Sequence, residues 1–190
     1  MSAPAKRLAT YADLVALPEE ARAEIIAGEL VLEPSPTPIH QSAVGELYAE
    51  LRNPFQRGRG GPGGWWLIQD VDVEFGAHDI CRPDITGWRK TNVPSFPAER
   101  PVRHRPDWIC EALSPGTALR DQSDKRAIYQ RAKVPWYWLL DPSNRTLTVL
   151  RLVEDGYIVE RVAGDQGTAE LPPFEAVAID LSSVFPPVAG

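Results

Sequence analysis

Short apolar blocks alternate with polar turns along most of this chain, and two segments have the spacing of a longer helix. Residues 39–51 carry apolar side chains at positions 39, 43, 44, 47, 48 and 51, which predicts an amphipathic helix packed on a sheet. Residues 121–133 are predicted to form another helix. Its residues Asp121, Lys125 and Tyr129 follow one another at intervals of four, so they share one face.

Short apolar runs bounded by Gly, Pro or Asp predict β-strands. The segments with this pattern are two strands about a turn at 27–28 within residues 24–33, and the runs 65–75, 81–88, 108–113, 136–141, 145–152 and 156–162. In residues 65–75 three acidic residues, Asp70, Asp72 and Glu74, alternate with apolar ones. This alternation predicts one half-exposed strand.

The remaining segments are predicted to be caps and connections. Thr10 is placed to N-cap a short helix over 10–17, with Asp13 at its third position. Residues 53–64 are rich in Gly and Arg and predict a mobile loop. Residues 89–106 predict a long Pro-rich connection, and the tail from 176 to 185 is expected to close the domain.

The order of these elements predicts an α/β fold with a mixed sheet. A strand, a helix and a strand succeed one another across residues 108–141, and such a unit pairs its two strands in parallel. The 190 residues suffice for a real core, so we expect one domain over 1–190, with residues 1–9 disordered.

Composition narrows the class of protein. Hydrophobic residues make up 43% and charged residues 24% of the chain, which is ordinary for a globular protein. The sequence has neither an apolar run of membrane-spanning length nor the pattern of a signal peptide, so we expect a cytoplasmic protein without membrane contact. Cys81 and Cys110 lack zinc-type spacing, and we expect buried, reduced thiols.

Charge is distributed unevenly along the chain. The net charge of −6 argues against generic coating of nucleic acid. Residues 82–133, however, carry eleven Lys and Arg against six Asp and Glu. The same basic segment contains one carboxylate in an unusual place, Glu111.

Glu111 lies within the apolar run 108–113, which is bounded by Pro106-Asp107 and by Ser114-Pro115-Gly116. The run predicts a buried strand. A carboxylate buried without a partner costs several kcal/mol, so Glu111 should be ion-paired, metal-bound or protonated. It is therefore a candidate functional residue.

Two other residues are candidate partners of Glu111. Asp84 follows Pro83 at the start of a predicted strand, where it is either a site residue or an exposed strand-end Asp. Lys125 follows the Glu111 strand on the next helix, where it either returns toward Glu111 or forms a surface pair with Asp121. Two neighbouring carboxylates repel unless a cation lies between them, and oxygen ligands suit Mg²⁺ or Mn²⁺.

These motifs also resemble a known family. The segments that carry the resemblance are Glu24-Ile-Ile-Ala-Gly-Glu-Leu-Val, residues 34–40, Arg82-Pro-Asp-Ile85, residues 106–115, Arg120-Asp-Gln-Ser-Asp-Lys125, Tyr129 and residues 134–142. In this order they resemble the PD-(D/E)xK nuclease superfamily, and more closely the Uma family of putative restriction endonucleases. The resemblance implies a restriction-endonuclease-like mixed β-sheet core flanked by helices, with extra antiparallel strands.

The resemblance also implies a set of site residues. It assigns Asp84 and Glu111 as metal ligands, with the backbone carbonyl of Ala112 as a further one. The superfamily lysine would fall at position 113, which is Leu here, so the resemblance assigns the catalytic lysine to Lys125 on the following helix.

Three outer residues have alternative interpretations. Glu24 is either an outer carboxylate of the site or, more simply, a solvent-facing Glu at a strand start. His40 either contacts metal or phosphate or is only a histidine at the N-terminus of a helix in a Pro-rich turn. Asp121 either orients Lys125 or caps its helix.

Three hypotheses about function follow. The first is a Mg²⁺-dependent (or Mn²⁺-dependent) endonuclease that hydrolyses DNA, with Asp84, Glu111 and Lys125 as its catalytic residues, acting by analogy as a homodimer. The second is an inactive binding module that keeps the nuclease fold. The third is a structural role, in which Arg82 or Arg126 neutralises a buried Glu111.

Overall fold

The computed structural model describes residues 7–18, 20–114 and 121–187, without the side chains of residues 121 and 122. Its centre is a six-stranded sheet in the order β10-β9-β8-β7-β6-β3. The strands are β3 (Trp65–Gln69), β6 (Ile85–Arg89), β7 (Trp108–Ala112), β8 (Trp136–Asp141), β9 (Thr146–Val153) and β10 (Gly156–Gly164). β7 and β8 pair in parallel and the other neighbours antiparallel, which confirms the predicted strand–helix–strand unit.

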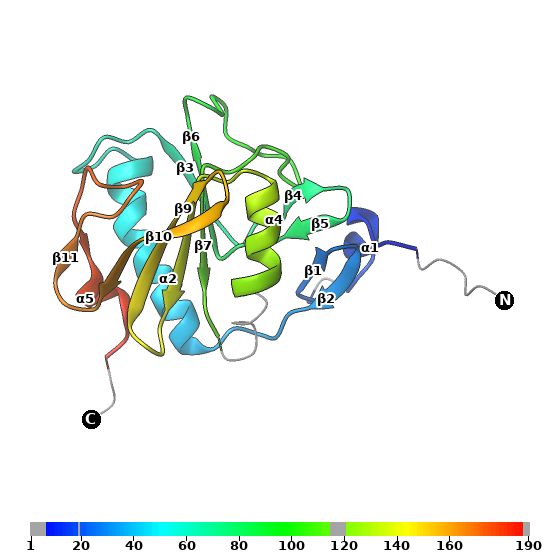
Figure 1. Ribbon diagram of the computed structural model, residues 1–190, viewed down its shortest axis with the longest axis horizontal. Helices are drawn as coiled ribbons and strands as arrows, with labels where there is room; N and C mark the ends of the chain where they lie inside the picture. The colour runs from blue at the N-terminus through cyan, green and yellow to red at the C-terminus, as the bar shows by residue number, and fades with distance from the viewer. Residues whose placement is uncertain (1–6, 19, 115–120, 188–190) are drawn as a thin grey trace.

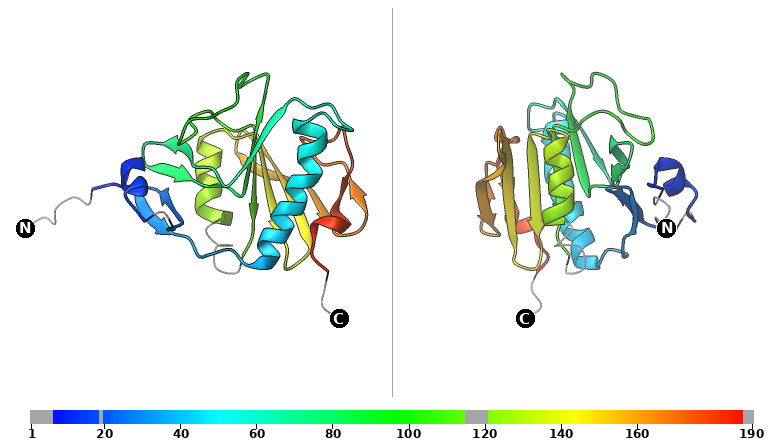
Figure 2. Two further views of the ribbon diagram at one scale, coloured as in Figure 1. Left: turned by 180° about the vertical axis from the view of Figure 1, so that it is seen from behind. Right: turned by 45° about the vertical axis from the view of Figure 1, so that its right-hand side comes forward.

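Helices cover both faces of this sheet. The long helix α2 (Pro38–Leu51) crosses one face and continues into a π-helical turn, η1 (Arg52–Gln56). The chain between β7 and β8 forms a second π-helical turn, η2 (Asp121–Lys125), and then α4 (Arg126–Arg131) on the opposite face. Figure 1 shows α4 in front of the sheet, and Figure 2 shows α2 in front when the molecule is seen from behind.

β7 is buried on both faces, and its side chains alternate between two cores. Trp108, Cys110 and Ala112 belong to the core that includes the apolar side of α2. Ile109 belongs to the core on the α4 side, together with Tyr129. Because side chains of a strand alternate, Glu111 points to the same side as Ile109, toward α4 and η2.

A second sheet of four strands, in the order β2-β1-β5-β4, lies next to α4 (Figure 1). Its strands are β1 (Ala23–Ile26), β2 (Glu29–Leu32), β4 (Val73–Gly76) and β5 (Asp79–Cys81). The predicted turn at 27–28 is confirmed, with positive φ angles at Ala27 and Gly28.

The two ends of the chain pack on these sheets. The short helix α1 (Tyr11–Val15) is capped as predicted, since Asp13 accepts hydrogen bonds from the backbone N–H and the hydroxyl of Thr10. At the other end, β11 (Thr168–Ala169) pairs with β12 (Ile179–Asp180), and α5 (Leu181–Val184) packs against α2. Within the described residues, no helix is long and apolar enough to cross a bilayer.

Several predicted boundaries were wrong. The predicted strand 65–75 is two strands in different sheets, because Asp70 has a φ of 54° and turns the chain between β3 and β4. The predicted strand 81–88 likewise divides at Arg82-Pro83-Asp84, where proline has no N–H for a ladder. The predicted loop 53–64 begins with helical residues, which belong to η1.

The predicted disorder of residues 1–9 falls mainly outside the described residues. Among the described residues of this segment, Ala9 donates its N–H to the carbonyl oxygen of Gly28 at 2.9 Å. Ser114-Pro115-Gly116, which bounds the apolar run 108–113, also lies largely outside the described part of the chain.

Candidate active site

Glu111 is buried near the end of β7, with 3% of its surface exposed. Its Oε1 accepts a hydrogen bond of 2.5 Å from the hydroxyl of Tyr129 and lies 3.3 Å from Nζ of Lys125. Burial, and then the Glu111 carboxylate, raises the pKa of Tyr129 well above its ordinary value. The phenol therefore keeps its proton and remains a donor to Glu111.

Lys125 lies between two buried carboxylates. Its Nζ is 2.9 Å from Oε2 of Glu24 and 3.3 Å from Oε1 of Glu111. Lys125 is 4% exposed and Glu24 is 2% exposed, so the surface interpretations of both residues were wrong. The other oxygen of Glu24 accepts the backbone N–H of Arg82 at 2.6 Å, which holds this carboxylate in place.

Asp84 lies immediately before β6. The register pairs Ile85 with Cys110, and one further step brings Asp84 opposite Glu111 on the neighbouring strand. Oδ2 of Asp84 accepts the backbone N–H of Ala112 at 2.7 Å and lies 3.3 Å from Nε2 of His40.

The helix α2 brings His40 to this position. Thr37 caps the helix by accepting the backbone N–H of His40 at 3.3 Å. His40 therefore belongs to the first turn of α2, with its ring directed to the end of the central sheet. The structure confirms the prediction of His40 at the N-terminus of a helix, and its ring lies near Asp84.

These five residues line one cavity of about 350 Å³. The structure thus brings together Glu24, His40, Asp84, Glu111 and Lys125 from five separate segments of the chain. The side chain of Asp121, the sixth predicted site residue, lies outside the described residues.

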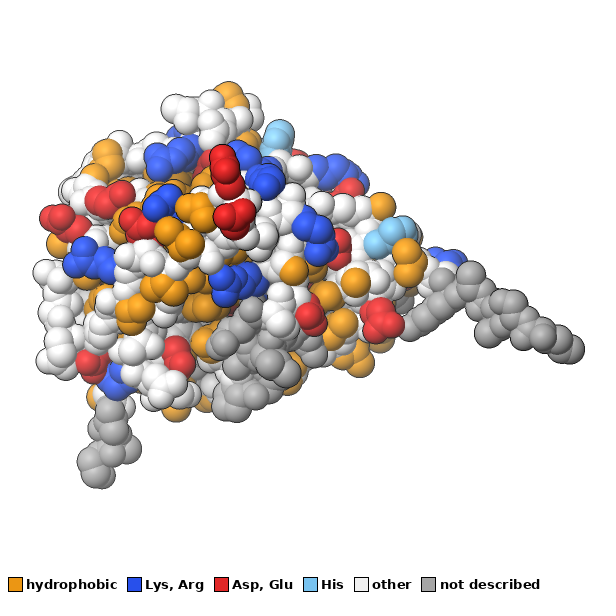
Figure 3. Space-filling view, viewed as in Figure 1, with side chains coloured by type: hydrophobic (Ala, Val, Ile, Leu, Met, Phe, Trp, Pro, Cys, Tyr) orange, Lys and Arg blue, Asp and Glu red, His pale blue; other side chains and the backbone are white. Residues whose placement is uncertain are grey.

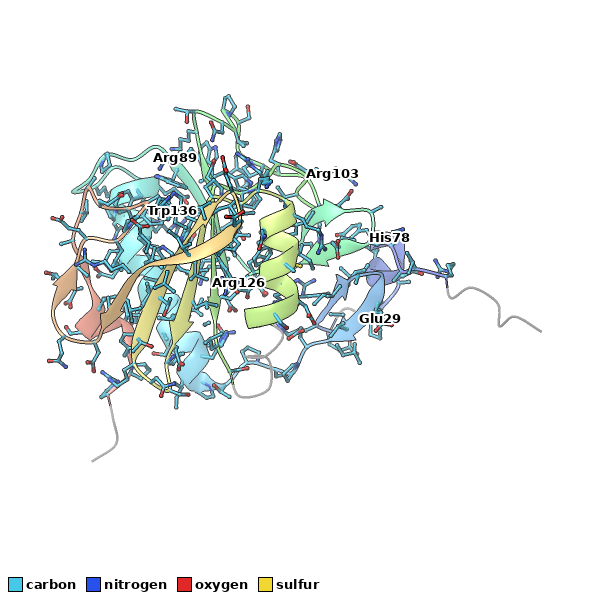
Figure 4. All side chains as sticks on the ribbon, in the orientation of Figure 1. Glu29, His78, Arg89, Arg103, Arg126 and Trp136 are labelled. Atoms are coloured by element: carbon cyan, nitrogen blue, oxygen red, sulfur yellow. The ribbon has the colours of Figure 1, made fainter. Side chains whose placement is uncertain are left out.

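The structural hypothesis for Glu111 required Arg82 or Arg126 as its counter-ion, and this pairing is wrong. Arg82 forms its ion pair with Asp72. Arg126 lies on α4 (Figure 4), and its Nη2 donates to the carbonyl oxygen of Tyr157 at 2.7 Å. Among the described residues, Lys125 is the cation that lies next to Glu111.

The donor set suits a hard divalent cation. Among the described residues, four carboxylates, those of Glu24, Glu33, Asp84 and Glu111, line the cavity together with the ammonium of Lys125, and the arginines of the wall are ion-paired with aspartates outside it. In the described part of the chain no three His, Cys, Asp or Glu side chains are arranged to hold a metal ion. Mg²⁺ is commonly bound through one or two carboxylates, with water and substrate phosphate as its remaining ligands, so Asp84 and Glu111 fit it.

Tyr129 is the residue whose role the sequence did not show. Its spacing placed it on the face of Lys125, but that spacing is equally typical of a core residue. Only the contact with Glu111 distinguishes it.

The excess of Lys and Arg over Asp and Glu in residues 82–133 does not appear as an excess of positive charge on the surface. Arg82 and Arg100 both pair with Asp72, and Arg131 pairs with Asp79. Figure 3 accordingly shows acidic and basic side chains interspersed over the face of the molecule on which α4 lies.

The sheet and its flanking helices define a restriction-endonuclease-like α/β fold. The same fold occurs in the crystal structure of a putative nuclease from Anabaena variabilis, with a TM-score of 0.72 at 21% identity over 93% of this chain and 97% of that chain. The family model of Uma2, described as "Putative restriction endonuclease", matches residues 8–182, and this chain belongs to that family. No curated protein matches the sequence.

Proposed function

We propose that this protein is a metal-dependent endodeoxyribonuclease that hydrolyses phosphodiester bonds at the cavity of Asp84 and Glu111. One observation carries the proposal: the register of β6 on β7 brings Asp84, immediately before β6, opposite Glu111, and the buried ammonium of Lys125 is 3.3 Å from Glu111. Family membership supports the same reaction. By analogy with other restriction-type folds, the proposal includes a homodimer in the cytoplasm.

Asp84 and Glu111 would hold Mg²⁺ or Mn²⁺. Such an ion lowers the pKa of a bound water molecule and neutralises charge that develops on the phosphate. Two further groups fix the ligands: the N–H of Ala112 orients Asp84, and the hydroxyl of Tyr129 orients Glu111. Ligands that are fixed before substrate binds need little reorganisation during the reaction.

Lys125 would act on the reacting groups directly. Its ammonium lies at the cavity wall, where it can donate hydrogen bonds to the attacking water or to a phosphate oxygen. Glu24 restricts the position of this ammonium through the 2.9 Å contact with Oε2. Glu24 is therefore a positioning residue, which acts through Lys125.

The test is cleavage of supercoiled plasmid by the purified protein in Mg²⁺ or Mn²⁺. We expect nicked and linear products from the wild type, and none from Glu111→Gln, from Asp84→Asn or in the presence of EDTA. Asp107→Asn is the matched control. Asp107 is also a buried carboxylate, but its oxygens accept from the N–H of Arg89 and the amide of Asn92, away from the cavity.

Two results would refute the proposal. One is cutting by Glu111→Gln at the wild-type rate, because it would trace the activity to a contaminant. The other is a wild-type protein that neither cuts DNA nor binds Mn²⁺ in calorimetry. The second result would favour the inactive binding module instead.

A further inference from the structure

A second cavity, of about 420 Å³, adjoins the candidate active site. One wall is apolar and comes from α1 and the segment after it, including Leu14, Val15 and Leu17. The other wall carries Tyr11, Asp72, Arg82 and Arg100. Arg82 and Ala23 line both cavities, so the two cavities are neighbours.

Asp72 organises the charged wall. It is 2% exposed, and its two oxygens bind different guanidinium groups: Oδ1 lies 2.7 Å from Nε of Arg82, and Oδ2 lies 3.1 Å from Nε of Arg100. The hydroxyl of Tyr11 adds a hydrogen bond of 3.2 Å to Oδ2. A single buried carboxylate thus pairs with two arginines, of which Arg82 is largely buried and Arg100 is exposed.

The arrangement has an excess of positive charge and of donors. Two guanidinium groups face one carboxylate, and each uses its Nε atom for Asp72. The terminal nitrogens of a guanidinium group are further N–H donors, which can serve an acceptor in the cavity. Guanidinium forks held in this way match the oxygens of a phosphate, which they bind by paired, charge-assisted hydrogen bonds.

We propose that Arg82 and Arg100, held by Asp72, form a binding site for a phosphate group. This inference rests on the proposed function for its preferred ligand, a non-scissile phosphate of the DNA strand that enters the neighbouring catalytic cavity. The apolar wall would contact the carbon atoms of the adjoining sugar. A phosphate bound here positions the strand and carries no sequence information.

Arg100→Ala in the full-length protein tests this site. The side chain of Arg100 is 72% exposed, and Asp72 keeps Arg82 and Tyr11 as partners without it, so the variant should fold. Arg131→Ala is the matched control, since Arg131 is 61% exposed and is also paired with an aspartate at 3.1 Å, but lines neither cavity.

The measurement is the affinity for a fluorescent DNA duplex at several salt concentrations, in Ca²⁺ so that the substrate stays intact. We expect Arg100→Ala to weaken binding about tenfold or more and to reduce the slope of log affinity against log salt by about 1, as loss of one phosphate contact does. Arg131→Ala should change neither quantity. The KM for cleavage should rise in Arg100→Ala with kcat nearly unchanged.

Calorimetry with inorganic phosphate separates the possible sources of the ligand. If wild type binds no DNA but binds phosphate, and Arg100→Ala abolishes that binding, the site stands as a free-phosphate site while the proposed nuclease function fails. If Arg100→Ala and Arg131→Ala weaken DNA binding equally, the effect is general electrostatics and the proposal is overturned. It is also overturned if Arg100→Ala changes neither DNA binding nor phosphate binding.

Discussion

Individual buried acids in this protein are of two kinds. Asp107 receives only hydrogen bonds from a backbone N–H and an amide, which is a structural arrangement. Glu24 and Glu111 instead lie on either side of one ammonium at the wall of a cavity. Burying charge costs free energy even when the charges are paired, so an ionic cluster at a cavity points to function more than to stability.

The hydroxyl of Tyr129 should matter for both stability and cleavage. Tyr129→Phe leaves a buried carboxylate oxygen without this donor, so we expect unfolding to become easier by about 1–3 kcal/mol. Loss of a group that orients a metal ligand commonly reduces metal affinity or activity about 10–100-fold. Chemical denaturation and plasmid cleavage measure the two effects.

Tyr157→Phe is the control for Tyr129→Phe. The hydroxyl of Tyr157 in the wild type is also buried and donates to the carbonyl oxygen of Val134 at 2.7 Å, outside the candidate active site. It should lose a similar amount of stability and keep its cleavage rate. Equal losses of activity in both variants would show that Tyr129 has only a structural role.

The two cysteines predict a loss of stability at alkaline pH. Burial raises the pKa of Cys81 and of Cys110 well above 9.0. Above pH 9 the unfolded chain releases both thiol protons while the folded protein keeps them, so stability falls as the pH rises. Each thiol contributes about 1.4 kcal/mol per pH unit to this fall. The double variant Cys81→Ala/Cys110→Ala should show a shallower fall in denaturation measured from pH 8 to 10; an unchanged slope would contradict the prediction.

At the scale of elements, β6, the strand that follows Asp84, is held in position by close packing against its neighbours. A Cβ atom at Gly87 would lie 3.0 Å from Leu67 Cδ2 and 3.0 Å from Trp108 Cε3. Gly87→Val should therefore destabilise the protein by about 1–3 kcal/mol, as overpacked cores do. Thermal denaturation measures the change.

Gly45 in α2 provides the opposite case. It is exposed, and a Cβ atom there would meet no atom within 4 Å. Gly45→Ala should stabilise the protein by about 0.5–1 kcal/mol, because alanine favours the helix and restricts the unfolded chain. A loss of stability in Gly45→Ala would mean that α2 does not extend through this position as described.

Element boundaries were predictable where a local signal set them. Thr10 with Asp13 and the turn at Ala27-Gly28 are local, and both appear where predicted. The division of residues 65–75 was not predictable from alternation, because that pattern continues through Asp70 although the chain turns there to enter another sheet.

At the scale of the whole molecule, Lys125 joins two parts of the fold. It connects Glu24 of the four-stranded sheet with Glu111 of the six-stranded sheet. Lys125→Met should cost about 3–5 kcal/mol of stability, since it leaves two buried carboxylates without their common cation. Arg131→Ala, which breaks an exposed pair with Asp79, should cost less than about 1 kcal/mol. Similar losses in the two variants would contradict a buried ionic link between the sheets.

The sequence by itself determined the buried strand around Glu111, the parallel unit that follows it and the family to which the motifs belong, because apolar periodicity and turn residues are local. It left Glu24 and Lys125 with surface interpretations that burial overturned. The tertiary structure decided which side chains meet. Glu24, Asp84 and Lys125 lie far from Glu111 or from one another in sequence. Only the register of β6 on β7 and the return of η2 over the sheet bring them to one cavity. The arginine wall around Asp72 arises in the same way, since a turn at Asp70 buries a residue that alternation had placed on an exposed face.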